Sequence, residues 1–517
     1  MLTDHTPFVH LAVFVAMGML IWDTIEVGRN DAANIINAVF GSRVMRRKTA
    51  VRIAAIAVII GAVASSDVMD TARKGIFDPT MLPVEAALAV YIAVYITDTV
   101  LLYSFSAFGM PISTTACLVF ELLGASFALG GFSIVSWGKS GTVISGIIVS
   151  IIISGAASFL VQRALRGAVG QNCKDPEQVK LHGPWISGAL LTGLIYFMLM
   201  KGMKNIDFVK YLKATTIDEF GAPAVLVILW AVLTGIISTV ISMYSKKIIP
   251  NLFSGLAILG MIAIAVAFGQ NDLANCASPG VASWMIWHEG TLASTMSIPR
   301  WLLLCCGLLL AVGMMSKTAQ RVTRAQVNTG SQGDVVRLYA PRWTIWLAKK
   351  IYRKHEGETV LAPEPTFNQD HKLAHYDALR AAVITSISAS VIAFASGRGL
   401  PVSTTYVSFA AIVATGWADR IFLRGDAYLK LGRTIWVVFC WFFSAFAAAA
   451  FAGMCAITIN KFGAYGIMIG LGANFCIRFY MKRRGNRQEE RLQQEADERK
   501  KEFYHEGDID LEEGDYE

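Results

Sequence analysis

A polar seven-residue motif occurs twice in this chain, each time directly after an apolar run long enough to cross a bilayer. The copies are Gly28-Arg29-Asn30-Asp31-Ala32-Ala33-Asn34 and Gly269-Gln270-Asn271-Asp272-Leu273-Ala274-Asn275. A charged Asp at the centre of a membrane helix costs about 2.5–3.5 kcal/mol, so such residues usually face a protein interior or a water-filled cavity on a solute pathway. The duplication therefore predicts two matching functional segments inside a membrane protein.

Composition supports an all-α polytopic membrane protein. Of 517 residues, 54% are hydrophobic and 16% charged, and the mean hydropathy is +0.50. Apolar runs of about 20 residues alternate with short basic loops, as expected of helices that satisfy their own backbone polar groups in lipid. The net charge of +8 does not indicate a nucleic-acid partner, because basic residues such as Arg46, Arg47 and Lys48 cluster beside apolar runs, the usual bias of cytoplasmic loops.

A second motif follows the first in both halves, before a short apolar stretch. Its copies are Pro111-Ile112-Ser113-Thr114-Thr115 and Pro401-Val402-Ser403-Thr404-Thr405. The second half is longer by about the length of a polar insert, so the pattern indicates an internal duplication. In transporters, such repeats place the substrate at their interface near the membrane midplane.

The duplication divides the chain into five parts. We expect a first transmembrane repeat in residues 1–170, connecting spans in 171–246, a second repeat in 247–316 and 376–481, a polar and cytoplasmic insert in 317–375, and a charged tail of frayed helix and disorder in 482–517. Basic residues in the insert and at Lys482 place the C-terminus in the cytoplasm. A re-entrant segment after Pro401 would place it outside, so the sidedness of the termini stays open.

The first motif favours cation binding. In the first copy, Asn30, Asn34 and Asn37 recur at i, i+4 and i+7 on one helical face, and the second copy has Asn271, Asn275 and Ser278 at the corresponding positions. Gly28 and Gly269 permit a helix break that would free backbone carbonyls. Carbonyl and carboxylate oxygens suit a hard cation such as Na⁺. The candidate cation ligands are Asn30, Asp31, Asn271 and Asp272, with Asp31 and Asp272 as the direct metal ligands.

The second motif favours anion binding. Pro is accepted in the first turn of a helix and Ser or Thr caps it, so a half-helix starting there points N–H groups and hydroxyls at the centre. Because an anion cannot comfortably share a dry pocket with two carboxylates unless cations lie between them, the two motifs together predict anion–cation co-transport. The candidate anion-binding residues are Ser113, Thr114, Thr115, Ser403, Thr404, Thr405, Asn34 and Asn275.

Each feature also has a purely structural interpretation. A single Asn-Asp pair near a helix end is more often a cap, and Pro-x-Ser-Thr-Thr alone is only a helix start; their paired repetition favours a site. Arg29 could clamp an anion or serve the structure, and its counterpart is Gln270. Asp98 and Glu121 could hold a proton or cation, or only a structural hydrogen bond.

At these four segments the chain resembles the inorganic phosphate transporter (PiT) family of sodium- or proton-coupled phosphate permeases. The resemblance implies about 12 membrane segments in two inverted repeats, each with a broken helix and a re-entrant hairpin, with phosphate at the centre and sodium on the Asn-Asp motifs. Many relatives carry His after the Ser-Thr-Thr tip and a carboxylate in the second span. This chain has Ala116, Tyr406 and Val58 there, which favours Na⁺ over H⁺ and leaves sulfate open as the anion.

The sequence thus predicts a secondary active importer of inorganic phosphate, coupled to Na⁺ or H⁺ by alternating access, in the inner cell membrane. It needs no cofactor besides the co-transported ion, and its partners are phosphate, the cation and the lipid bilayer, with a homodimer as one option. A sulfate or other oxyanion permease is the nearest alternative. An intramembrane enzyme using Asp31 and Asp272 is more remote, because no Gly-x-Ser-x-Gly or His-Glu-x-x-His motif accompanies them.

Overall fold

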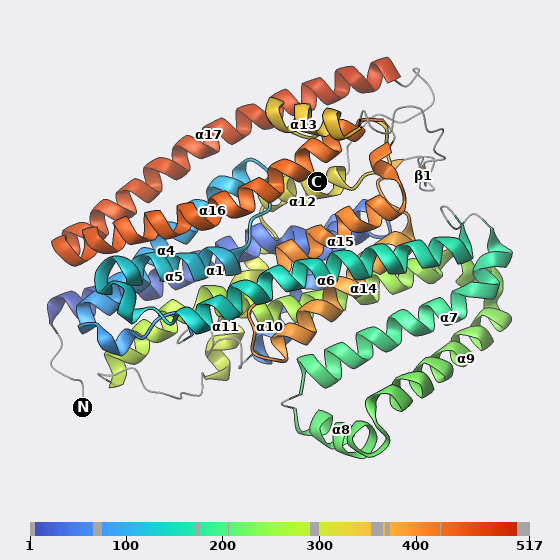
Figure 1. Ribbon diagram of the computed structural model, residues 1–517, viewed down its shortest axis with the longest axis horizontal. Helices are drawn as coiled ribbons and strands as arrows, with labels where there is room; N and C mark the ends of the chain where they lie inside the picture. The colour runs from blue at the N-terminus through green and yellow to red at the C-terminus, as the bar shows by residue number, and fades with distance from the viewer. Residues whose placement is uncertain are drawn as a thin grey trace.

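The computed structural model describes residues 6–65, 75–170, 173, 175–204, 206–289, 299–352, 366–367, 373–423 and 425–503. Figure 1 shows an elongated bundle in which most long helices run roughly side by side. The principal helices are α1 (Pro7–Gly41), α2 (Arg47–Val63), α4 (Val84–Ala107), α5 (Thr114–Gly130), α6 (Trp137–Val169), α7 (Pro176–Ile195), α8 (Asp207–Phe220), α9 (Ala222–Ile248), α10 (Leu252–Glu289), α11 (Arg300–Met314), α12 (Ala319–Thr329), α13 (Arg342–Tyr352), α14 (Ala378–Ser396), α15 (Thr404–Ala418), α16 (Ala427–Phe462) and α17 (Ala464–Phe503).

Short elements complete the fold. A π-helical segment, η4 (Tyr196–Gly202), continues α7, and 3-10 turns occupy η1 (Pro79–Met81), η2 (Phe132–Ile134), η5 (Ile249–Asn251) and η7 (Ile421–Leu423). Two-residue strands β1 (Thr366–Phe367) and β2 (Leu373–Ala374) pair antiparallel. Within the described residues, seven helices are long and apolar enough to cross a membrane, or eight if the bent pair α11 and α12 forms one span. Apart from these two short strands, the regular structure of the described chain is helical, as expected of a multi-pass membrane protein.

The two motif helices are continuous, so the expected break at their glycines is wrong. α1 runs unbroken through Gly28, and α10 runs unbroken through Gly269. The glycines serve close helix packing instead. A Cβ on Gly28 would lie 2.1 Å from the carbonyl oxygen of Leu310 in α11, and a Cβ on Gly269 would lie 2.2 Å from that of Val58 in α2.

α4 and α5 form a hairpin whose open end lies beside the start of α1. The Thr6 hydroxyl, which caps α1, donates to Glu85 at the start of α4, and Phe77 bridges to Val135 just beyond α5. The turn of this hairpin contains Ser113, which lies deep in the bundle with 1% of its surface exposed.

α14 and α15 form a second hairpin whose open end lies at the opposite end of α1. The His375 N–H, just before α14, donates to the carbonyl of Gly41. Arg166 in α6 pairs with both Asp377 at the start of α14 and Asp419 at the end of α15. This hairpin therefore points in the opposite direction to the first one.

The C-terminal helix does not fray at the membrane surface, contrary to the expectation for residues after Lys482. α17 continues through Phe503 (red in Figure 1), and its outer half packs against the segment between α12 and α13. Glu489 pairs with Arg324 and Arg337, and Arg499 pairs with Asp426. Through these ion pairs, the charged part of α17 after Lys482 is held by the rest of the protein, which explains why it stays helical. Residues 504–517 lie outside the described part of the chain.

Candidate functional site

The two hairpin turns and the two motif helices meet at one place inside the bundle. All twelve residues that the sequence singled out lie in these four segments, and each exposes 2% or less of its surface: Asn30, Asp31, Asn34, Ser113, Thr114, Thr115, Asn271, Asp272, Asn275, Ser403, Thr404 and Thr405. Segments far apart in sequence thus form one fully enclosed polar cluster. The sequence-based expectation that the four motifs converge agrees with this geometry.

The hairpin turns touch each other through a reciprocal pair of hydrogen bonds. The Thr115 hydroxyl donates to the carbonyl of Val402 at 3.0 Å, and the Thr405 hydroxyl donates to the carbonyl of Ile112 at 3.1 Å. Each bond joins a threonine of one turn to the residue before the capping serine of the other. The two turns therefore contact each other in the same way from opposite sides.

The motif helices hold the turns through a second reciprocal set. Asn30 Nδ2 donates to the carbonyl of Ile112 at 2.8 Å, and Asn271 Nδ2 donates to that of Val402 at 2.7 Å. One helical turn later, the amides of Asn34 and Asn275 donate at 2.8 and 2.9 Å to the hydroxyls of the opposite hairpin's threonine, Thr405 and Thr115 respectively. Each asparagine thus has a clear positioning function.

Thr114 connects the two carboxylates. Its hydroxyl lies 3.1 Å from Asp31 Oδ2 and 3.1 Å from Asp272 Oδ1, so both side chains reach one oxygen atom. Asp31 Oδ1 also lies 2.9 Å from the Thr405 hydroxyl, whose one proton it shares with the carbonyl of Ile112. Two carboxylates this close in a buried site repel each other unless a positive charge lies near them. The described residues that contact them contribute hydroxyls and amides, which are neutral.

Several oxygen atoms of this cluster have no hydrogen-bond partner among the described residues. They are Asp272 Oδ2, Asn275 Oδ1 and Thr404 Oγ1. Buried polar atoms are normally satisfied, so unsatisfied oxygens beside two carboxylates are suited to a bound cation. Within the described chain, no group of three or more His, Cys, Asp or Glu side chains could hold a metal, so a cation here would also need hydroxyl, amide or backbone oxygens. That ligand set fits a hard monovalent cation better than zinc or copper.

Ser113 and Ser403 act as helix caps. The Ser113 side chain accepts from the N–H of Ala116, and the Ser403 side chain accepts from the N–H of Tyr406. Capping leaves the other first-turn N–H groups of α5 and α15 directed at the cluster, and the two positive helix ends face each other across it. This arrangement suits an anion, and the two serines contribute by shaping the turns.

Gln326 in α12 was not predicted as a site residue. Its Nε2 donates to Asn34 Oδ1 at 2.8 Å, and its Oε1 accepts from Asn37 Nδ2 at 2.7 Å. It is 292 residues from Asn34 in the chain and lies in the segment that looked like a polar insert. No periodicity or motif in the sequence could have indicated this contact.

Arg29, Asp98 and Glu121 lie outside the cluster's hydrogen-bond network. Arg29 donates to both carboxylate oxygens of Glu26, which also pairs with Arg478 of α17, so it has a structural partner. Asp98 and Glu121 are 2% and 0% exposed, and both oxygens of Glu121 have no hydrogen-bond partner among the described residues. They remain candidates for a proton or cation.

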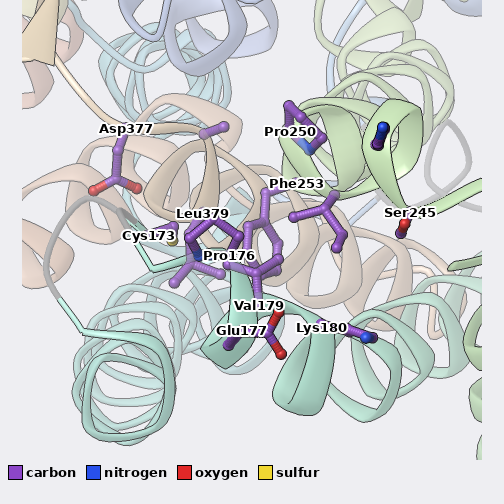
Figure 2. Close-up of a pocket in the computed structure, with 13 residues that line it drawn as sticks. Cys173, Pro176, Glu177, Val179, Lys180, Ser245, Pro250, Phe253, Asp377 and Leu379 are labelled. Carbon is purple, nitrogen blue, oxygen red and sulfur yellow. The ribbon is translucent and has the colours of Figure 1, made fainter. Parts of the chain in front are cut away.

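A separate cavity of about 580 Å³ lies between α7, α9, α10 and α14 (Figure 2). Figure 2 shows Asp377, Cys173 and Glu177 around it, with Phe253 and Leu379 as apolar lining. None of the twelve motif residues lines this cavity. It is therefore distinct from the polar cluster.

Comparison with known proteins decides the family. The model of the phosphate transporter family matches residues 27–326 and 370–452, which include all four motifs. The chain belongs to the phosphate transporter family. The matched segments contain the part of α1 that carries the motif, all of α10 and both hairpins, so the polar cluster lies in the part of the chain that family members share.

Curated relatives match along almost their whole length. A relative from Thermococcus kodakarensis is 27% identical over 449 residues, which cover 86% of this chain and 95% of the relative. One from Haemophilus influenzae is 24% identical over 442 residues, covering 82% and 91%. Both carry the name "putative phosphate permease".

One solved structure has the same fold. It is titled "The sodium-dependent phosphate transporter", matches with a TM-score of 0.64 at 20% identity, and covers 87% of this chain and 100% of the solved chain. At this identity the match supports the arrangement of helices. The residue contacts described above belong to the present chain.

Proposed function

We propose that this protein imports inorganic phosphate by secondary active transport, coupled to cations with Na⁺ favoured over H⁺. The observation that carries the proposal is the junction of the two hairpin turns: two helix N-termini face each other beside a pair of carboxylates that share the hydroxyl of Thr114. The helix ends suit a tetrahedral anion, and the carboxylates suit cations. The solved neighbour is named as sodium-dependent, which supports the choice of Na⁺.

An inverted repeat belongs to this proposal. The glycine contacts are reciprocal as well, because a Cβ on Gly61 of α2 would lie 2.1 Å from the carbonyl of Val266, and one on Gly313 of α11 would lie 2.1 Å from that of Ile25. With the opposed hairpins, these contacts support two repeats of opposite orientation around one central site. In such transporters one half moves against the other, so the site opens to each side in turn.

The electrical balance supports two or more cations per phosphate. Moving a dianion into a cell against about 100 mV, inside negative, costs roughly 4.6 kcal/mol, at about 2.3 kcal/mol per charge. Two monovalent cations cancel this cost, and a third makes uptake electrogenic. In this proposal the carboxylates of Asp31 and Asp272 hold two of these cations.

Sulfate is the nearest alternative anion, since hydroxyl and N–H donors bind both tetrahedral dianions. An enzyme using the two carboxylates finds less support, because the neighbours of Asp31 and Asp272 are orienting amides and hydroxyls rather than a positioned nucleophile and base. A family of phosphate permeases also argues for transport.

The test is uptake of radiolabelled phosphate into proteoliposomes, with Na⁺ replaced by choline and with sulfate or arsenate as competitor. We expect uptake to need Na⁺ and to be blocked by arsenate more than by sulfate. Asp31→Asn and Asp272→Asn should each abolish coupled uptake while the protein still inserts. Wild-type rates in either variant, or uptake that persists in choline at neutral pH, would contradict the proposed coupling.

Counterflow separates a carrier from a channel. Unlabelled phosphate inside the vesicles should accelerate the entry of labelled phosphate. The reason is that an alternating-access carrier reorients its binding site across the membrane faster when the site is occupied than when it is empty. A channel would show no such acceleration.

A further inference from the structure

A basic cavity lies at one end of the bundle, away from the polar cluster. It has a volume of about 970 Å³ and lies between α13, the start of α16 and the outer half of α17, which lie together in Figure 1. One acidic residue, Glu495, lines it. Its basic lining residues are all arginines: Arg342, Arg484, Arg487, Arg491 and Arg499.

Most of these guanidinium groups are not neutralised by the protein. Arg499 pairs with Asp426, and Arg484 donates to the hydroxyl of Tyr480. Arg342, Arg487 and Arg491 are exposed and form no ion pair with any described residue. Planar guanidinium groups that converge on one hollow bind phosphate groups well, because each can donate two parallel hydrogen bonds.

An apolar groove adjoins the basic cavity through shared lining residues. Phe108, Tyr339 and Met481 line both the basic cavity and a second hollow of about 270 Å³. Met481 also lines a third hollow of about 510 Å³, which shares Ser104 and Phe105 with the second. The third hollow runs between α4, α16 and α17, and its lining is almost entirely apolar, with Leu101, Ala447, Phe451 and Ile477 among the residues.

The basic cavity lies at the level of the membrane surface. α13 beside it ends with Lys349 and Lys350, and its Trp343 and Trp346 are 46% and 64% exposed. Tryptophans collect at the interface between hydrocarbon and water, and amphipathic helices with basic residues lie in that plane. A phosphate group bound by the arginines would therefore sit at headgroup depth, with the groove extending into the hydrocarbon.

We propose that this connected cavity binds an anionic phospholipid, with its headgroup phosphate on the arginines and an acyl chain in the groove between α4, α16 and α17. The occupant is a lipid rather than a soluble anion because the apolar hollows share lining residues with the basic cavity. The proposal is independent of the transported solute. Since α4 is one arm of the hairpin that carries Thr114, the bound lipid would stabilise the position of that hairpin and so influence transport.

The test is native mass spectrometry of the purified full-length chain titrated with phosphatidylglycerol or phosphatidylcholine in detergent. We expect saturable binding of phosphatidylglycerol. In Arg487→Gln/Arg491→Gln it should weaken roughly 30-fold, whereas a control that removes two charges from the same helix outside the cavity, Lys482→Gln/Arg483→Gln, should change it by less than about threefold.

The acyl chain is tested separately. Ala447→Trp fills the apolar groove and should weaken phosphatidylglycerol binding, and glycerophosphoglycerol, the same headgroup without chains, should compete poorly. The proposal is overturned if phosphatidylcholine binds equally well, if both double variants lose binding to the same extent, or if glycerophosphoglycerol binds as tightly as the lipid. The last result would identify the cavity as a site for a soluble organic phosphate.

Discussion

Asn34 shows how single amides fix the geometry of the site. Its Nδ2 donates to Asp31 Oδ1 and to Thr405, while its Oδ1 accepts from Gln326. The side-chain amide of Asn34 could rotate about its last bond, which would exchange the positions of its oxygen and nitrogen. A hydrogen-bond donor that faces the oxygen prevents this rotation and keeps the NH₂ group directed at the carboxylate of Asp31. Gln326 supplies that donor, and it is in turn held by Asn37. The orientation of a motif residue therefore depends on a helix outside both motifs.

Gln326→Leu should lower the apparent affinity for the co-transported cation. Loss of the donor to Asn34 Oδ1 lets the amide rotate, and one or two hydrogen bonds of about 0.5–1.5 kcal/mol each disappear, so the KM for Na⁺ should rise roughly 10-fold. Initial rates of phosphate uptake against Na⁺ concentration measure this. Gln320→Leu at the start of the same helix is the control. An unchanged KM in Gln326→Leu would show that Asn34 does not need this donor.

At the scale of helices, the glycines of the motifs determine how closely neighbours pack. In this fold the carbonyl oxygen of a neighbouring helix occupies the position where a side chain would begin at Gly28 or Gly269. Small residues at such contacts let membrane helices approach each other, and close contact supplies much of their association energy in lipid. The same pairing joins α1 to α11 and α10 to α2, so the motif helices are fixed against their supports on both sides of the site.

Gly28→Ala should therefore destabilise the protein although alanine is the better helix former. The added methyl meets backbone at 2.1 Å, which forces the two helices apart, and overpacking of this kind costs about 1–3 kcal/mol or more. Gly18→Ala in the same helix has nothing within 4 Å of the new methyl and should be neutral or stabilising by up to about 1 kcal/mol. Thermal unfolding of both variants in the same detergent, followed by size-exclusion chromatography, distinguishes them. Equal melting temperatures would contradict the packing role.

At the scale of the whole molecule, the sequence predicted which residues meet at the site better than it predicted where helices break or continue. The duplicated motifs identified the twelve residues of the cluster because buried polar groups in a membrane protein are costly and their repetition is not accidental. The role of Gly28 depends on a carbonyl 282 positions later, at Leu310, so its sequence neighbourhood suggested a helix break that does not exist. The helical continuation of α17 depends on ion pairs of Glu489 with Arg324 and Arg337, 165 and 152 positions earlier, and of Arg499 with Asp426, 73 positions earlier.

The fold also makes the sidedness of the molecule testable. Arg324, Arg337 and the outer half of α17 lie at the end of the bundle where α1 finishes, whereas α6 begins at the other end, near Phe77. Basic residues favour the cytoplasm, so we expect the C-terminus inside and the start of α1 outside. In a variant lacking reactive native thiols, Lys139→Cys should react with a membrane-impermeant maleimide on intact cells, and Lys482→Cys should react only after permeabilisation. The opposite pattern would mean that the hairpin of α14 and α15 opens to the outside and that the C-terminal end of α17 also lies outside.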